Sequence, residues 1–195
     1  MKPIIAAFDF DGTITTKDTF LQFIIFVKGK FLFFIGFSIF LPLIILSFTG
    51  LYSKSKCKEK IFSYFFKNME YSVFCRYCIS FSDKIDTFLN NETMNFIEKH
   101  KIDGNKIYII SASVEEWLVP FVQKHGILNV IGTKIEVKNG LITGKFASKN
   151  CIGQEKVNRF LQEEPNRDFY ILYAYGDSIG DKELLEFANR AWNVK

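Results

Sequence analysis

Short runs of apolar residues alternate along this chain with segments in which apolar residues recur at helical spacing. Three of the runs stop abruptly at a polar residue: 3–8, 106–110 and 169–175. Helical spacing marks three further segments: 84–100, 114–125 and 154–162. Short continuous apolar runs are typical of strands buried on both faces, and strands that alternate with helices favour a parallel sheet. The pattern therefore predicts an α/β fold with helices on both faces of the sheet.

Two local signals add detail to this pattern. Ser113 and Glu116 have the spacing of a capping box, which predicts that Ser113 caps the second of the helices. Asn139-Gly140 is a turn signal that predicts a small antiparallel hairpin. The strands of this hairpin are expected near 134–137 and 141–143.

The stretch at 16–82 breaks the alternation of strands and helices. It is mostly apolar with helical spacing and contains no strand followed by a turn and a helix. We predict that it forms an all-helical cap, inserted into an α/β core made of 1–15 and 83–195.

Each predicted strand ends in a cluster of polar residues. The clusters are Asp9-Phe10-Asp11-Gly12-Thr13, Ser111-Ala112-Ser113 and Gly176-Asp177-Ser178-Ile179-Gly180-Asp181. Because ligands bind outside the carboxyl ends of the strands in a parallel α/β sheet, we expect all three clusters to meet in one crevice. Carboxylates gathered there repel one another unless a cation lies among them, and Mg²⁺ prefers such oxygen ligands.

These residue types suit the transfer of a phosphoryl group. One carboxylate of the Asp9 and Asp11 pair can attack phosphorus, and a second can protonate the leaving oxygen and later activate water. Gly12 allows the backbone to approach a phosphate, and Thr13 and Ser111 offer hydroxyl donors.

Two further positions complete this candidate site. Lys156 lies near the start of a predicted helix after Gly153, where an anion is favoured. Asp177 is the natural third metal ligand, and Asp181 is placed to orient Lys156 or a metal-bound water.

In this order, the Asp9–Thr13 motif, Ser111, Lys156 and the Gly176–Asp181 motif resemble the four motifs of the haloacid dehalogenase-like hydrolases. The resemblance implies that Asp9 is the nucleophile and Asp11 the acid/base. It assigns the phosphate to Ser111 and Lys156, and Mg²⁺ to Asp9, the carbonyl of Asp11 and Asp177. It further places a set of residues beside the substrate or in support: Gly12, Thr13, Ala112, Ser113, Asp18, Ser178 and Asp181.

An aspartate at position 11 favours a phosphatase, because the ATPases of this family have threonine there and the dehalogenases lack this carboxylate. The insertion resembles the helical cap of the phosphoserine-phosphatase-like branch, whose core is Rossmann-like. Asp18 stands where that branch has an acidic cap residue, although aspartate is also a good helix N-cap.

The function implied is Mg²⁺-dependent hydrolysis of a phosphate monoester, with a small phosphorylated metabolite as substrate. One alternative keeps the chemistry and takes a lipid phosphate at the membrane surface, since the apolar cap resembles phosphatidylglycerophosphate-phosphatase-like relatives. Another is an inactive relative that binds a membrane or a partner. Asp9, Asp11, Lys156 and Asp177 weigh against the last reading, because an inactive protein has no chemical need for all four.

An uncharged run of 23 residues, Phe31–Ser53, is long enough to suggest a transmembrane helix. A single crossing, however, would separate Asp9 from Ser111 and Asp177. Pro42 is expected to split the run into two helices too short to span a bilayer. We therefore predict a helical hairpin that packs as a cap, pairs with a second copy of the chain or enters one leaflet. Lysines on both sides of the run suit an anionic membrane surface.

Composition and charge narrow the remaining classes. The chain has 195 residues and a net charge of +4, too small to indicate nucleic-acid binding without a focused patch. Its four cysteines do not make a disulfide scaffold in a chain of this length, and no signal-peptide pattern precedes Phe20. We expect a cytoplasmic protein, or one peripheral to the membrane. His100 and His125, each beside a lysine at a predicted helix end, are expected at the surface.

Overall fold

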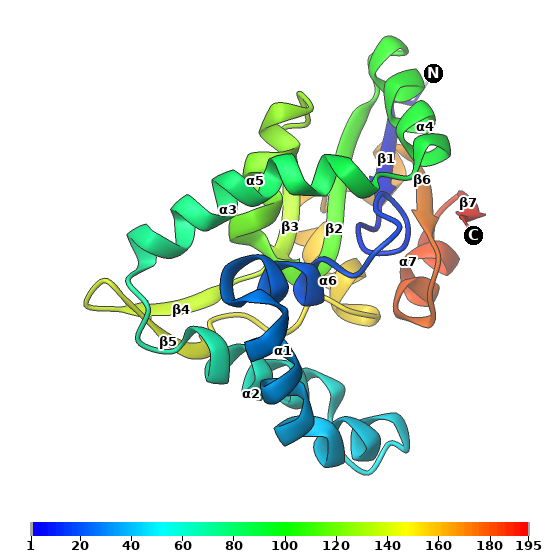
Figure 1. The fold of residues 1–195 in the computed structure, drawn as a ribbon. Coiled ribbons are helices and arrows are strands. Elements are labelled where there is room, and N and C mark those ends of the chain that lie inside the picture. The colour runs from blue at the N-terminus through cyan, green and yellow to red at the C-terminus, as the bar shows by residue number, and fades with distance from the viewer. Residues whose placement is uncertain (1, 195) are drawn as a thin grey trace.

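The computed structural model describes residues 2–194. Five parallel strands form the central sheet, in the order β3-β2-β1-β6-β7 (Figure 1). Their bounds are β1 (Ile4–Phe8), β2 (Lys106–Val114), β3 (Asn129–Thr133), β6 (Ile171–Gly176) and β7 (Arg190–Asn193). Because β1 pairs with β2 on one side and β6 on the other, the three predicted strand ends lie at the same edge of the sheet. The predicted α/β fold is confirmed, while β3 and β7 were not among the predicted strands.

Helices cover both faces of this sheet. Those of the core and its flanks are α4 (Asn91–Ile102), α5 (Glu115–Lys124), α6 (Gln154–Glu163) and α7 (Lys182–Phe187). Ala6 and Phe8 of β1 belong to the apolar cluster that includes α4 and α5. Ile5 and Ala7 point to the opposite face, where they pack in the cluster that includes α6 and α7. The alternation of side chains along a strand therefore supplies both layers of the core.

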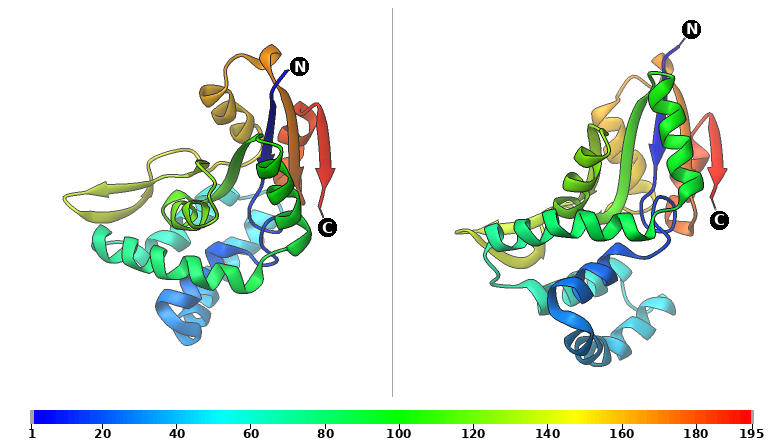
Figure 2. Two further views of the ribbon diagram at one scale, coloured as in Figure 1. Left: turned by 90° about the horizontal axis from the view of Figure 1, so that it is seen from above. Right: turned by 45° about the horizontal axis from the view of Figure 1, so that its top comes forward.

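A helical insertion separates β1 from β2 in the sequence, as predicted. Its cap part contains α1 (Thr19–Phe48), α2 (Lys54–Phe66) and α3 (Tyr71–Ile85), and α4, which falls in the predicted core, follows before β2. Figure 2 shows α1 and α2 as a pair at the far side of α3 from the sheet. The predicted hairpin is also present, as β4 (Ile135–Lys138) and β5 (Leu141–Phe146), and α2 packs against it. The helix α3 runs through residue 83, where the sequence places the boundary between cap and core.

The uncharged apolar run at Phe31–Ser53 does not form the helical hairpin that was predicted for it. The helix α1 continues through Pro42, and its kink lies at Gly29, whose φ of 78° is rarely adopted by other residues. Because proline has no N–H, the carbonyl of Ser38 lacks its helical hydrogen-bond donor at Pro42. Both residues are exposed, so water can donate to that carbonyl instead. The prediction that Pro42 splits this segment is therefore wrong, and 30–48 pairs instead with α2.

The packing of α1 on α2 is close. A side chain at Gly36 would lie 2.2 Å from the ring of Phe65, and Phe40 contacts Tyr64 edge to face. By length and composition alone α1 is long and apolar enough to cross a membrane, and only 17% of its most apolar window is buried. The helix α2 packs on α1 with one side and on the β4–β5 hairpin with another. The helix α1 therefore lies on the outside of the cap, and its side away from α2 is uncovered.

Three local expectations are corrected by the structure. The predicted helix over 84–100 is interrupted, because α3 ends at Ile85 and Asn90 caps a new helix by accepting hydrogen bonds from main-chain N–H groups of α4. Ser113 does not cap α5, which begins after Val114, because Ser113 belongs to β2. His100 is buried rather than at the surface, with Nε2 2.9 Å from the Tyr175 hydroxyl.

Candidate active site

A cavity of about 310 Å³ opens at the carboxyl edge of the sheet, between the core and the cap. We call it the active-site cavity. From the core it is lined by Asp9, Asp11, Ser111, Ala112, Asn150, Ile152, Lys156, Ser178, Gly180 and Asp181. From the cap it is lined by Asp18, Lys54 and Lys58. The predicted convergence of three strand ends on one crevice is therefore what the parallel sheet produces.

Asp9 follows β1 directly and is held by a buried lysine. The residue is 6% exposed, and its main-chain N–H donates to the carbonyl of Tyr175, 2.8 Å away on β6. Lys156, at the start of α6 and 2% exposed, donates to Asp9 and to Asp181. Two buried carboxylates thus share one buried ammonium, so a single positive charge faces two negative ones.

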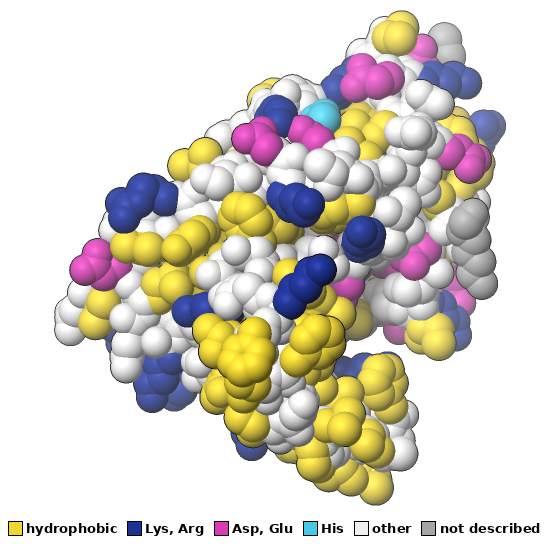
Figure 3. Space-filling view, in the orientation of Figure 1, with side chains coloured by type: hydrophobic (Ala, Val, Ile, Leu, Met, Phe, Trp, Pro, Cys, Tyr) yellow, Lys and Arg dark blue, Asp and Glu magenta, His cyan; other side chains and the backbone are white. Residues whose placement is uncertain are grey.

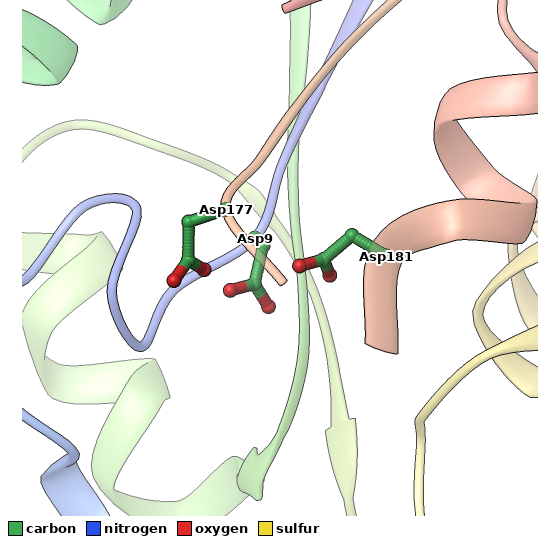
Figure 4. Close-up of side chains that lie close together, drawn as sticks. All are labelled: Asp9, Asp177 and Asp181. Carbon is green, nitrogen blue, oxygen red and sulfur yellow. The ribbon is translucent and has the colours of Figure 1, made fainter. Parts of the chain in front are cut away.

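A third carboxylate completes a cluster that could hold a metal ion. Carboxylate oxygens of Asp9, Asp177 and Asp181 all lie within 4.8 Å of one another, and Figure 4 shows the three side chains converging. The hydroxyl of Thr13 donates to Asp177 over 3.2 Å and to Asp9 over 3.4 Å. Gly12 closes the other side, since a β-carbon there would lie 2.3 Å from Oδ2 of Asp177.

The electrostatics of this cluster show a deficit of positive charge. Burial raises the pKa of Asp9 to about 7, although Lys156 opposes the shift. Burial and the neighbouring Asp181 also raise the pKa of Asp177. Burial lowers the pKa of Lys156, but the attraction of Asp9 and Asp181 exceeds this effect and raises it overall. A hard divalent cation with oxygen ligands, such as Mg²⁺, fits a group of three carboxylates that one ammonium does not neutralise.

Asp11 occupies a different place from Asp9 and turns toward the cap. Its carboxylate accepts hydrogen bonds from the main-chain N–H of Thr19 over 2.7 Å and from the Thr19 hydroxyl over 2.5 Å. The Ser113 hydroxyl donates to its other oxygen over 2.5 Å. Burial, with a further contribution from the charge of Asp18, raises the pKa of Asp11. The side chain therefore lies outside the carboxylate cluster, and a role for Asp11 in metal binding is left to its carbonyl, as the sequence resemblance has it.

The remaining predicted residues divide into those that line the cavity and those that support it. Ser111 and Ala112 of β2 line it, and the Ser111 hydroxyl accepts a hydrogen bond from the main-chain N–H of Ser113. Asp18 also lines it and caps α1 by accepting a hydrogen bond from the N–H of Leu21, so both of its suggested roles have a structural counterpart. Ser113 does not line the cavity but contacts Asp11.

The turn after β6 fixes Asp181 in place. Ser178 donates to Asp181 from its main-chain N–H over 3.0 Å and from its hydroxyl over 2.7 Å, while its own oxygen accepts from Gly180. These contacts occupy one oxygen of Asp181 and leave the other for Lys156. Ser178 thus supports the cluster, which is the part the sequence suggested for it.

Two lysines of the cap, which the sequence indicated only as part of a basic flank, enter the site. Lys58 of α2 donates to the carbonyl of Ala112 over 3.0 Å, and its ammonium lies 5.0 Å from the centre of the Phe20 ring. Lys54 stands one helical turn earlier and lines the same cavity. Their spacing of four residues, which places both on one face of a helix, was the available signal.

The family model described as haloacid dehalogenase-like hydrolase matches residues 6–186. Among curated proteins, the chain is similar to Protein CicA of Caulobacter vibrioides, with 30% identity over 190 residues, which cover 96% of this chain and 84% of that protein.

Among solved structures, the fold is similar to that of a protein of unknown function from Bordetella pertussis. The TM-score is 0.84 at 18% identity, with 98% of this chain and 89% of that chain covered. It is also similar to a phosphoserine phosphatase with a phospho-aspartyl intermediate analogue, at a TM-score of 0.67 and 16% identity, with 98% and 86% covered.

Proposed function

Because the chain belongs to the haloacid dehalogenase-like hydrolases, we propose that it is a Mg²⁺-dependent phosphatase that hydrolyses small phosphate monoesters through an aspartyl-phosphate. The observation that carries the proposal is the group of Asp9, Lys156 and Asp181, which are buried and line the active-site cavity, with the half-buried Asp177 beside them. The phospho-aspartyl analogue in the similar phosphoserine phosphatase supports the same chemistry.

In the first step a carboxylate oxygen of Asp9 attacks phosphorus, so that a phosphorus–oxygen bond to Asp9 forms and the bond to the ester oxygen breaks. Asp11 gives its proton to the leaving oxygen. The raised pKa of Asp11 favours the protonated form that this step needs. Thr19 and Ser113 hold the Asp11 side chain in place for the transfer.

In the second step water attacks the phosphorus of the aspartyl-phosphate. Asp11, now ionised, takes a proton from that water, inorganic phosphate leaves and Asp9 is restored. Mg²⁺, held by Asp9, Asp177 and the carbonyl of Asp11, would supply positive charge to the phosphate oxygens. Lys156 and the hydroxyl of Ser111 add donors on the protein side.

The test is replacement of Asp9 by asparagine, assayed with an aryl phosphate and Mg²⁺. We expect Asp9→Asn to lower turnover by about 10³-fold or more, since the nucleophile is removed, while circular dichroism shows an intact fold. Asp168→Asn, an exposed aspartate outside the cavity, is the matched control and should keep full activity. Beryllium fluoride should bind the wild-type protein and not Asp9→Asn. Near wild-type turnover of Asp9→Asn would contradict the proposal.

A further inference from the structure

A second, apolar groove continues from the active-site cavity into the cap, between α1 and α2. Its volume is about 290 Å³. It shares Asp18, Lys54 and Lys58 with the active-site cavity, so the two hollows meet at these three side chains. Beyond them its walls are mainly apolar, formed by Phe20, Leu21, Phe37, Ile44, Phe48 and Ile61. We call this hollow the α1–α2 groove.

The lining changes abruptly from charged to apolar between the active-site cavity and the α1–α2 groove. At the catalytic end stand the charged groups Asp9, Lys156 and Asp181, which suit a phosphate. At the junction the Lys58 ammonium is held by the carbonyl of Ala112 and lies over the ring of Phe20, which begins the apolar wall. Past the junction, Ser47 and Cys57 are the only polar side chains among residues 2–194 that line the groove. A small polar metabolite would find few partners there.

Part of the groove lies on the open side of the cap. Phe48, which lines it, is 76% exposed, and α1 carries further uncovered apolar side chains along its length: Phe31, Phe34, Ile39 and Ile45. Figure 3 shows hydrophobic side chains gathered over this end of the molecule. The groove therefore connects the active-site cavity to the apolar surface of the cap.

We propose that the α1–α2 groove binds the apolar chain of an amphiphilic phosphate monoester whose phosphate lies at Asp9. The inference rests on the proposed function, because the phosphate site is the same. Substrates of this class carry a phosphate at one end and an alkyl or acyl chain at the other, so polar and apolar ends match the two hollows. Lys54 and Lys58 stand where the head of such a molecule joins its chain.

The test is a series of n-alkyl phosphates from ethyl to decyl, assayed below their micelle concentrations. These esters share one leaving-group chemistry, so the chain length alone varies. We expect kcat/KM to rise about two- to fourfold for each added methylene until the groove is filled. The upper value corresponds to the roughly 0.8 kcal/mol of one fully buried methylene, and the lower one to a chain covered on one side.

Ile44 and Ile45 offer a matched pair of variants. They are adjacent on α1, but Ile44 lines the groove whereas Ile45 is 55% exposed and lies outside it. Ile44→Gln should flatten the rise with chain length, and Ile44→Trp should end it at a shorter chain. Ile45→Gln should keep the wild-type rise. The readout is the ratio of decyl to ethyl phosphate within one variant, so a general loss of activity cancels.

Binding of n-alkylphosphonates, which cannot be hydrolysed, separates this inference from the proposed function. If no alkyl phosphate is hydrolysed, the proposed function fails, and the groove is still tested by whether phosphonate affinity rises with chain length. The inference is overturned if neither kcat/KM nor affinity rises with chain length in the wild-type protein. It is also overturned if Ile45→Gln flattens the rise as much as Ile44→Gln does, since the chain would then lie elsewhere.

Discussion

Replacing Gly12 by alanine should separate two demands made on this position, its backbone conformation and its closeness to Asp177. The φ of Gly12 is +89°, so a β-carbon costs about 1–2 kcal/mol in conformation alone. The new β-carbon would also lie 2.3 Å from Oδ2 of Asp177, where ordinary contact begins at 3.4 Å. The carboxylate must therefore withdraw by roughly 1 Å, and a misplacement of that size costs about 10²-fold in rate.

Gly104→Ala is the matched control for this experiment. Gly104 has a φ of +70° and nothing within 4 Å of the position of a β-carbon, and it precedes β2 at the opposite edge of the sheet. Both variants should lose about 2–4 °C in Tm for each kcal/mol of strain. Only Gly12→Ala should lose about 10²-fold in kcat/KM and need more Mg²⁺ for half-maximal rate. The same rate and the same Mg²⁺ dependence in both variants would refute the placement of Asp177 in the carboxylate cluster that holds Mg²⁺.

Three further predictions concern the acid/base, the carboxylate cluster and the cap. Asp11→Asn should lower turnover by about 10²–10⁴-fold without weakening Mg²⁺ binding, and full recovery at saturating Mg²⁺ would contradict the role. Because the pKa of Asp9 is raised from 3.8 to about 7, the folded chain holds more protons than the unfolded one between these values, so metal-free stability should fall as pH rises through that range. The gain in Tm on adding Mg²⁺, followed by differential scanning fluorimetry, should accordingly be larger at about pH 8 than at about pH 5, and equal gains would contradict it. Replacing Phe31, Phe34 and Phe48, which are 64–77% exposed, by serine should reduce flotation with anionic vesicles or self-association in sedimentation, whereas unchanged behaviour in both would assign this face no partner.

The three central strands could be predicted because the sequence itself marks where each of them begins and ends. β1, β2 and β6 are apolar runs followed by polar residues, and parallel pairing brings these polar residues to one edge of the sheet, although β2 continues through Ser111–Ser113 to Val114. The edge strands β3 and β7 have no such run. In β7 the sequence Arg-Ala-Trp-Asn is mostly exposed, and only its pairing with β6 makes it a strand. That pairing is a tertiary contact, which periodicity within four residues does not contain.

The sequence predicted which residues form the site better than it predicted the hydrogen bonds between them. Ser113 and Glu116 have the spacing of a capping box, yet the Ser113 hydroxyl bonds Asp11, which is 102 residues away. Thr19, the other partner of Asp11, has no motif around it and reaches the site because Asp18 starts α1 there. A local signature competes with every polar group that the fold brings near. The carboxylate of Asp11 is a charged acceptor for the proton of the Ser113 hydroxyl, whereas the start of a helix offers only N–H donors.

The cap shows most clearly where reasoning from hydrophobicity ends. An uncharged run with one proline is compatible with a helical hairpin and with a membrane-spanning helix, because both consist of apolar residues over a similar length. The deciding residues are two glycines. Gly29 bends the chain so that 30–48 can turn along α2, and Gly36 leaves the space into which the ring of Phe65 fits. Since α2 packs in turn on the β4–β5 hairpin, these contacts tie the apolar helix to the wall of the active-site cavity. The hydrophobicity that suggested a membrane segment is therefore placed beside the phosphate site, where one side of the helix forms the α1–α2 groove and the other remains open.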